Sequence, residues 1–287
     1  MKTKILFLGL VLSLFTVSCT KDSADNSTIT ADEATVNAKI DIANDDVSDI
    51  VETQFNATMD NSTTGKNSEA ATTTYPIITR VPAFGTPITA GTLVTKTIDY
   101  GTAGVTLANG NVLKGKIIIS FTYEPTATSH TLNYTFDNFY HNNIKFDGTK
   151  TFTRTMTSGT NAHPIVVMTM DMTATFPDGR VFTRTGTRTR EIISGYDTPS
   201  VLADNVYQVT GSWSTTFPNT TVQTSTITSP LIVKMSCIAV NKPLLVQGVI
   251  TFVRNTHTAT LDYGTGDCDN IAIFTINGVA HTIIIGN

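Results

Sequence analysis

Alternation of apolar and polar residues from about residue 76 to 287 constrains the fold more than any other feature of this sequence. In 164–176, PIVVMTMDMTATF, the even positions from 166 onward are apolar, while positions 169, 171, 173 and 175 are polar. A period of two places the apolar side chains on one face of a β-strand. The same alternation recurs in 130–140, 206–217 and 231–240. We therefore expect roughly a dozen strands, each with one buried face.

Turn signals separate these segments at short intervals. The dipeptides are of the kind that favours tight hairpins; they are Asn109-Gly110, Asp147-Gly148, Asp178-Gly179, Pro218-Asn219 and Asn277-Gly278. Threonine makes up about one residue in five of this region, and it suits the exposed side of a pleated sheet. Successive strands are therefore expected to pair antiparallel.

Residues 30–59 have a different period and are predicted to form a helix. Thr30 and Glu33 form a candidate capping box. The apolar residues that follow recur at helical spacing: Val36, Ile40, Ala43, Val47, Ile50, Val51 and Phe55. The segment 60–75 is rich in Thr, Ser and Asn and is expected to be a linker between the helix and the β domain of 76–287.

A sheet with one apolar face must bury that face against another layer. The sequence therefore predicts a mainly β fold with one N-terminal helix: a curled antiparallel β-meander of roughly a dozen strands, packed with the helix. The alternative is a two-sheet β-sandwich with the helix outside.

The first residues have the layout of a secretory signal, with Lys2 and Lys4 before an apolar stretch from residue 5 to about 17. The stretch is shorter than the ~20 apolar residues that a membrane-spanning helix needs. Thr16-Val17-Ser18-Cys19 resembles a bacterial lipobox, which implies removal of residues 1–18, acylation of Cys19 and a flexible tether over 19–29. Lys21-Asp22 resembles the short surface-export signal of Bacteroidota lipoproteins. An ordinary secretory signal with an incidental cysteine is the alternative.

Charge and cysteine usage limit the function classes. Residues 22–69 hold eleven Asp or Glu, whereas 75–287 hold twelve acidic residues against fourteen Lys or Arg. Neither part is basic enough to predict nucleic-acid binding. Beyond Cys19 only Cys237 and Cys268 remain, an even pair that suits an oxidising compartment. A meander returns both to one end of the sheet, so we expect a disulfide, with two buried free thiols as the alternative.

Four segments resemble the C-terminal part of exported lipoproteins of the Bacteroidota: VYQVTG (206–211), SPLIVKMSC (229–237), QGVITF (247–252) and DYGTGDCDN (262–270). The resemblance implies a secreted or surface-displayed β-rich domain and includes the cysteine pair. It implies no enzymatic activity.

Two groups of residues are candidate ligand sites. Arg180, Arg184, Arg188 and Arg190 share one face of a strand. If the Asp178-Gly179 turn pairs Met172 with Thr185, this face is the outer one, and it could grip sulfate, carboxylate or phosphate groups of a glycan. The alternative is a solvated strand whose charges discourage edge pairing. Asp262, Asp267 and Asp269 are candidate calcium ligands, and a turn held by the disulfide explains the same residues.

The sequence contains no recognisable catalytic signature. It lacks His-Glu-x-x-His, Cys-x-x-Cys, Gly-x-Ser-x-Gly, a phosphate loop and a dinucleotide fingerprint. We therefore expect a non-catalytic lipoprotein of the outer membrane, on the cell surface rather than the periplasmic face, that binds a glycan or a protein partner and needs no cofactor. The alternatives are a carrier of a lipid or other apolar ligand between sheet and helix, and a hydrolase with an unrecognised site.

Overall fold

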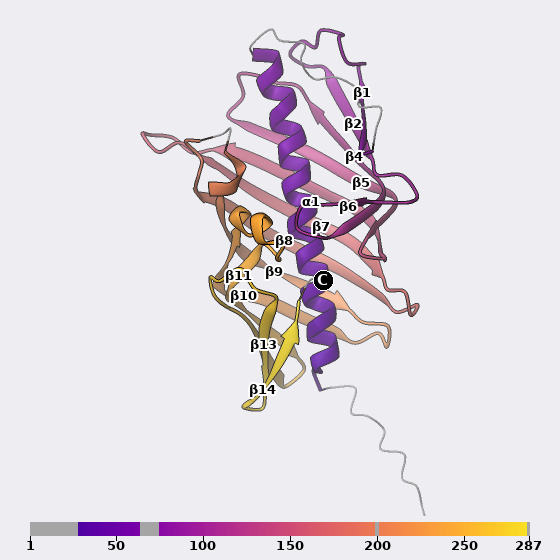
Figure 1. The fold of residues 1–287 in the computed structure, drawn as a ribbon, viewed down its shortest axis with the longest axis vertical. Helices are drawn as coiled ribbons and strands as arrows, with labels where there is room; N and C mark the ends of the chain where they lie inside the picture. Colours follow the sequence, from indigo (N-terminus) through magenta and orange to yellow (C-terminus); the bar gives the residue numbers. More distant parts are fainter. Residues whose placement is uncertain (1–27, 64–74, 199–200, 286–287) are drawn as a thin grey trace, which may run out of the picture.

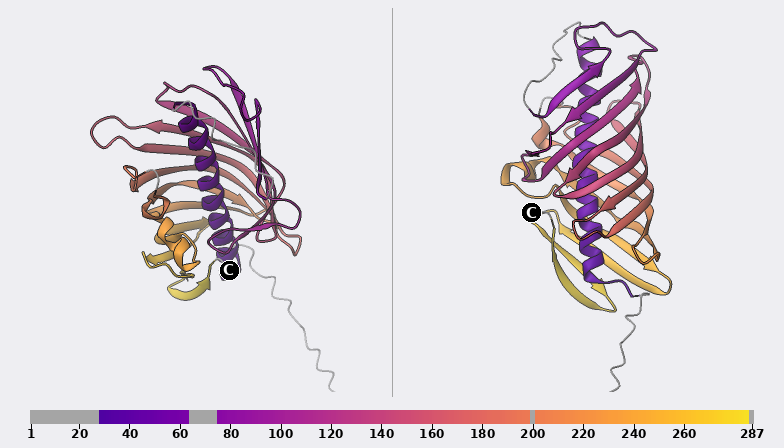
Figure 2. Two further views of the ribbon diagram at one scale, coloured as in Figure 1. Left: turned by 45° about the horizontal axis from the view of Figure 1, so that its top comes forward. Right: turned by 90° about the vertical axis from the view of Figure 1, so that its right-hand side faces the viewer.

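A single antiparallel sheet curls around one long helix (Figures 1 and 2). The computed structural model describes residues 28–63, 75–198 and 201–285. The helix is α1 (Ala31–Thr63). The strands are β1 (Ile77–Val81), β2 (Leu93–Asp99), β3 (Val105–Thr106), β4 (Val112–Thr122), β5 (Ser129–His141), β6 (Ile144–Met156), β7 (Pro164–Thr175), β8 (Val181–Ser194), β9 (Val206–Thr216), β10 (Val222–Lys234), β11 (Leu245–Arg254), β12 (His257–Thr265), β13 (Ile271–Ile276) and β14 (Val279–Ile284). Two short 3-10 helices, η1 (Leu202–Asp204) and η2 (Met235–Val240), interrupt the strands.

The strands form an almost uninterrupted meander. Their order is the chain order from β1 to β14, except that the two-residue β3 pairs with β4 and lies off the main path. All fourteen strands belong to one sheet, so the predicted curled meander packed with a helix is confirmed and the alternative sandwich is not formed. The left view of Figure 2 shows the sheet wrapping around α1.

The helix begins with the predicted capping box. The Thr30 backbone N–H donates to Glu33 Oε2 at 3.0 Å, and the Glu33 N–H donates to Thr30 Oγ1 at 3.2 Å. These two bonds satisfy backbone donors that the first helical turn leaves without partners. The helix ends at Thr63, four residues beyond the predicted 59. Within the described residues, no helix has the length and apolar character needed to cross a bilayer.

The helix contributes to two apolar clusters in the interior. Val36, Ile40, Val47, Val51 and Phe55 pack with strands from the N-terminal half of the sheet. A second face, with Ala34, Ala38 and Ile42, packs with strands from the C-terminal half. Apolar side chains therefore lie on two sides of the helix, because the curled sheet reaches around it.

Loops close over the side of α1 that the sheet leaves open. Asn109 and Asn111, between β3 and β4, donate to the two carboxylate oxygens of Asp46 at 2.8 and 2.7 Å. A Cβ at Gly110 would lie 2.8 Å from Oδ1 of Asn241, the residue after η2. The loop and η2 therefore meet, and the middle of the helix is enclosed.

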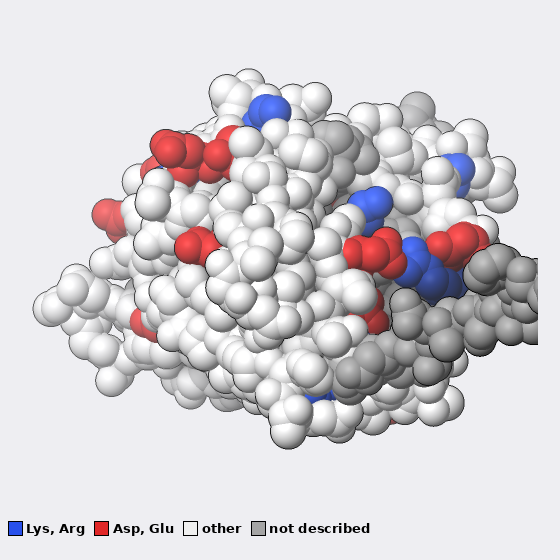
Figure 3. All heavy atoms as spheres, turned by 90° about the horizontal axis from the view of Figure 1, so that it is seen from below, with Lys and Arg blue, Asp and Glu red and all other residues white. Residues whose placement is uncertain are grey.

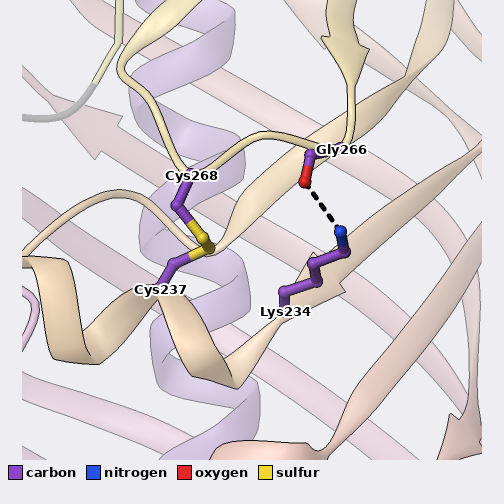
Figure 4. Close-up of a disulfide and its surroundings, with 4 residues drawn as sticks. All are labelled: Lys234, Cys237, Gly266 and Cys268. Atoms are coloured by element: carbon purple, nitrogen blue, oxygen red, sulfur yellow. Dashed lines mark hydrogen bonds between the residues drawn. A yellow bond between two sulfur atoms is a disulfide. The ribbon is translucent and has the colours of Figure 1, made fainter.

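The predicted disulfide joins Cys237 to Cys268, with 5.3 Å between their Cα atoms (Figure 4). Cys237 lies in η2 rather than on the strand that the alternation indicated. Beside the bridge, Lys234 Nζ donates to the Gly266 carbonyl at 2.7 Å. The bridge and this bond hold the segment after β12 against the end of β10.

Candidate functional site

The four arginines of β8 and its preceding turn do not form the predicted outer face. Met172 pairs with Arg184 rather than with Thr185. The turn is one residue longer than expected: Phe176 N–H donates to the Arg180 carbonyl, which leaves three residues in the loop. A one-residue change in register exchanges the two faces of a strand. The arginines therefore share the concave face with the methionines of β7.

Three of these arginines are buried against α1. Arg184, Arg188 and Arg190 are exposed by 1%, 2% and 8%. Arg184 Nη1 donates to Asp41 Oδ1 at 2.6 Å, and Arg188 forms a short ion pair with the same oxygen. Only Arg180 keeps contact with solvent, and it pairs with Asp32 and Asp178. The anionic-glycan interpretation of this face is therefore wrong, because the helix already supplies the carboxylates.

Each of these buried cations also lies over an aromatic ring of the sheet. The guanidinium carbon of Arg188 is 4.0 Å from the Trp213 ring centroid, and that of Arg190 is 3.5 Å from the Tyr207 centroid. Desolvated cations gain from such contacts with the ring face. The arginines therefore bridge the helix and the sheet through two kinds of interaction.

The network continues along the helix toward β5 and β6. His141 Nε2 lies 2.7 Å from Asp46 Oδ2, and Lys150 forms a short hydrogen bond with Asn44 Oδ1. Burial raises the pKa of Asp45 to about 7 and lowers the pKa of Lys150 to about 7. Burial disfavours the charged form of either group. The interior therefore contains two groups that titrate close to neutrality without contact with bulk solvent.

The calcium candidates are not brought together. Asp262 Oδ1 accepts the Gly264 N–H at 2.8 Å, and Asp269 Oδ1 accepts the Ile271 N–H at 3.0 Å. These bonds shape the turns at either end of the 262–270 segment. In residues 28–63, 75–198 and 201–285, no three His, Cys, Asp or Glu side chains are arranged to hold a metal ion.

One group of residues resembles a hydrolytic triad in composition but not in its hydrogen bonds. His163 lies between a hydroxyl, Thr157 Oγ1 at 3.5 Å, and a carboxylate, Glu191 Oε1 at 2.8 Å. The Nδ1 atom that faces Thr157 is also 2.6 Å from the carbonyl oxygen of Asn161. Both ring nitrogens therefore face acceptors, and the hydrogen bond to Glu191 raises the pKa of His163. Thr157 donates its hydroxyl hydrogen to the His163 backbone carbonyl at 3.0 Å, so its hydrogen bond is not directed at the ring.

Between sheet and helix, where a carried apolar ligand was expected, apolar side chains of α1 pack directly against the strands. Val36, Ile40, Val47, Val51 and Phe55 are exposed by 3% or less and pack against strands. Two pockets that border α1 have volumes of about 160 and 170 Å³, below the roughly 300–1,000 Å³ of typical small-molecule sites, so the carrier hypothesis stays a prediction.

A different site, not identified from the sequence, lies on the outer side of β2, β4 and β5. It is a pocket of about 510 Å³ lined by Tyr75, Tyr140, Lys114, Lys116, Asp99 and Asp137, among others. Small-molecule sites occupy roughly 300–1,000 Å³ and combine apolar or aromatic surface with a few polar groups. The pocket has both properties.

A β-bulge in β5 builds one wall of this pocket. Lys114 pairs with Tyr140 and Lys116 pairs with Asp137, so β5 contains one residue more than β4 over this stretch. The extra residue is accommodated at Asn138, which has a φ of 46°. Bulges redirect side chains and occur often beside functional sites. Here the bulge lets Asp137 and Tyr140 line the pocket while the buried Phe139 between them points inward.

Two glycines permit the close approaches that shape the pocket. A Cβ at Gly115, where φ is +76°, would lie 1.9 Å from the Asn138 carbonyl oxygen. A Cβ at Gly101, where φ is +68°, would lie 2.8 Å from the Tyr75 ring. The sequence feature of this site is therefore glycine close to tyrosine and lysine, within and beside strands. This feature is too common to identify the site from the sequence.

The charges of the pocket balance. Lys116 pairs in register with Asp99 on β2, and its Nζ lies 3.6 Å from Asp137 Oδ2. With Lys114, the lining carries two positive and two negative side chains. Asp99 is further held by the Gly101 N–H, which donates to its Oδ1 at 2.8 Å. The arrangement favours a neutral ligand with several hydroxyl groups over a strongly charged one.

Comparison with protein-family models, with curated proteins and with solved structures finds no match to this chain. The candidate function therefore depends on the residues and geometry described above.

Proposed function

We propose that this protein is an exported, membrane-anchored module that binds a neutral glycan in the pocket between β2, β4 and β5. The observation that carries the proposal is the pocket lining, in which two tyrosines accompany a charge-balanced set of lysines and aspartates. Aromatic rings pack against the apolar face of a sugar, and the phenol, carboxylate and ammonium groups hydrogen-bond its hydroxyls. A neutral saccharide uses all of these groups without leaving a net charge uncompensated.

The proposed location depends on the N-terminal sequence. Residues 1–27, including Cys19, lie outside the described residues. Two or more acyl chains on a processed Cys19 would hold the protein at a membrane almost permanently. Intact-mass measurement of protein from its native membrane tests this part. A mass that starts at Cys19 and includes acyl chains supports it, and a chain retaining residues 1–18 contradicts it.

Glycan binding is tested with full-length protein on an array of neutral and anionic polysaccharides, followed by calorimetric titration of the best neutral binder. Tyr140→Ala removes one aromatic wall and should weaken binding roughly tenfold or more, as loss of a central aromatic contact commonly does. Tyr196→Ala is the matched control, because this half-buried tyrosine lies after β8 and outside the pocket. Its affinity should stay at the wild-type value.

Asp137→Asn tests the charge argument separately. This variant keeps the side-chain shape, removes one of the two negative charges and gives the pocket a net positive charge. Its preference should move toward anionic saccharides while folding is unchanged. If wild-type protein binds no neutral saccharide, or if Tyr140→Ala and Tyr196→Ala behave alike, the proposed function is wrong.

A further inference from the structure

The last strand of the sheet, β14, leaves one long edge open. The Ile285 N–H donates to the Asn270 carbonyl at 2.8 Å, which fixes the direction of the backbone groups along the β13–β14 ladder. In an antiparallel pair, every second residue directs its N–H and C=O toward the partner strand. Residues 279, 281 and 283 therefore bond to β13, and Ala280, Thr282 and Ile284 direct theirs away from it. No strand among the described residues pairs with this outer side.

This edge lacks the features that protect most sheet edges. Edge strands are commonly blunted by charged residues, proline or a bulge. The sequence of β14 is VAHTII, with no Lys, Arg, Asp, Glu or Pro, and its register with β13 is continuous over six pairs. Residues 279–282 are exposed, and Ile284 is 57% exposed. A continuous, uncharged and accessible edge is a template for another strand.

The first strand of the sheet differs in this respect. Arg80 of β1 donates to the carbonyl oxygens of Pro82 and Ala83, which folds the following loop back along the strand. β1 also has a proline immediately before it and another immediately after it. The two ends of the sheet are thus built differently: among the described residues, the β14 edge lacks the charged residues and prolines that protect an edge, whereas β1 has a proline at each end.

An apolar patch accompanies the open edge on the convex face. Ile271 and Ile284 face each other across β13 and β14, and Ile273 faces Thr282. The three isoleucines are 42%, 57% and 36% exposed. Exposed apolar residues that lie beside one another, rather than singly, often mark an interaction surface.

We propose that β14 pairs antiparallel with β14 of a second copy of this chain, about a two-fold axis at Thr282. In that register Thr282 faces its own counterpart, and Ala280 faces Ile284 of the other copy. Each of the three outward residues offers one donor and one acceptor, so the two copies together form six backbone hydrogen bonds. Two uncharged β14 edges can pair through their backbone groups alone. Because the edge carries no charge that would attract a charged peptide, we expect a second copy as the partner. Closed two-fold dimers with such isologous contacts are the commonest assemblies.

The pairing also extends the apolar patch. Side chains of 280, 282 and 284 lie on the convex face with Ile271 and Ile273. Ile284 of one copy would cover Ala280 of the other, and the isoleucines of both copies would become one surface. The proposed dimer does not involve the glycan pocket. The pocket lies on β2, β4 and β5, and β14 is at the opposite end of the strand order.

The test is analytical ultracentrifugation of full-length protein in detergent over a wide concentration range. Wild type should show a concentration-dependent dimer. Thr282→Lys places two like charges opposite each other on the axis and should shift the dissociation constant at least tenfold toward monomer. Thr187→Lys is the matched control, because Thr187 is exposed on the convex face of β8, in the middle of the sheet; it should dimerise like wild type.

A cysteine placed on the axis identifies the partner. Paired residues of an antiparallel ladder have Cα atoms about 4.5–5.5 Å apart, within disulfide range. Thr282→Cys should therefore give a covalent dimer of this chain on mild oxidation, whereas Thr187→Cys should not. Wild type that remains monomeric at high concentration, Thr282→Lys that dimerises like wild type, or equal cross-linking by both cysteine variants would each overturn the proposal. Circular dichroism of each variant reports whether the fold is retained.

Discussion

The concave and convex faces of β8 carry opposite kinds of side chain. On the concave face, Arg184 and Arg188 are buried and paired with Asp41 of α1. On the convex face of the same strand, Thr183, Thr185 and Thr187 are exposed. The usual pattern puts apolar residues inside and polar ones outside, but here both faces are polar and the inner one is charged. Polarity alone therefore did not identify the solvent-exposed face of this strand.

The convex face shows how regular the outer surface is. One row of directly paired, solvent-accessible positions crosses eleven strands, and every member is Thr, Ser or Asn: Thr95, Ser120, Asn133, Thr151, Thr169, Thr187, Ser212, Thr226, Thr251, Thr260 and Thr275. Such side chains satisfy their hydrogen bonds with water or with a neighbour. On the end of the molecule seen in Figure 3, most of the described surface belongs to uncharged residues, and several acidic and basic residues lie next to one another. Substitution on this surface should therefore affect stability very little.

The concave face depends on pairing between distant parts of the chain. Asp41 is bound by two arginines and by the Tyr263 hydroxyl at 3.3 Å, and the carboxylate is fully buried. A buried ion pair gains little over an apolar replacement, but removal of one partner leaves an uncompensated charge. The network therefore specifies the position of the helix more than it stabilises the protein.

The largest effect should come from breaking this network at its centre. Asp41→Ala leaves Arg184 and Arg188 without their shared carboxylate, and the free energy of unfolding should fall by about 3–5 kcal/mol. Urea denaturation measures the change. Asp171→Ala, an exposed aspartate on the convex face of the neighbouring strand β7, is the matched control and should cost less than about 0.5 kcal/mol. Similar losses for both would contradict the difference between the two faces.

The pH dependence of stability should be the next largest effect. The pKa of Asp45 rises from 3.8 to about 7 on folding, so the folded state binds more protons between these values and stability falls as pH rises from about 4 to 7. The pKa of Lys150 falls from 10.5 to about 7, so the unfolded state binds more protons above 7 and stability rises from about pH 7 to 10.5. Together these two groups contribute a stability minimum near neutrality. The fall on the acid side and the rise on the alkaline side should each be on the order of 4 kcal/mol, at 1.36 kcal/mol per pKa unit.

Two variants separate the limbs of that profile. Asp45→Asn should flatten the acid limb only, and Lys150→Met should flatten the alkaline limb only. Urea denaturation at intervals from pH 4 to 10 measures both. A wild-type profile that rises steadily toward neutrality from the acid side, unchanged in Asp45→Asn, would show that Asp45 does not titrate as proposed.

Replacing the whole network should cost less than breaking it. In a variant with Asp41→Leu, Arg184→Met, Arg188→Met and Tyr263→Phe, no charge is left unpaired among these four positions. The free energy of unfolding should stay within about 2 kcal/mol of wild type, because buried ion pairs are often replaced by apolar residues at little cost. Thermal and urea unfolding report the value. A loss as large as that of Asp41→Ala would mean that the ions themselves stabilise the fold.

The smallest effect should come from the convex row. Thr187→Ala removes an exposed hydroxyl in the middle of the sheet and should change the free energy of unfolding by no more than about 0.5 kcal/mol. Differential scanning calorimetry against wild type is sensitive enough to detect a larger change. A loss above about 1 kcal/mol would show that the hydroxyl rows stabilise the sheet cooperatively.

Local signals in the sequence were sufficient for the secondary structure and its connectivity. Alternation identified the strands of the β region, and Thr30 with Glu33 marked the start of the helix within one residue. Asn109-Gly110, Asp178-Gly179 and Asn277-Gly278 lie in turns between paired strands, whereas the turn predicted at Asp147-Gly148 was wrong, because both residues lie inside β6. The pairing of Cys237 with Cys268 followed from the meander. These features are predictable because each depends on a few neighbouring residues or on the order of adjacent strands.

The orientation of β8 and the candidate pocket were decided only by tertiary structure. A three-residue loop in place of a two-residue turn moved Arg184 from the outer face to the inner one, and both loop lengths are compatible with the same sequence. Asp41 and Arg188 are 147 residues apart, and no local pattern reports that they meet. The pocket likewise depends on one extra residue in β5, whose position is set by packing against both neighbouring strands. The sequence determined which elements form and in what order. The number of residues in one turn decided which face of β8 is buried, and contacts between distant residues decided where a ligand could bind.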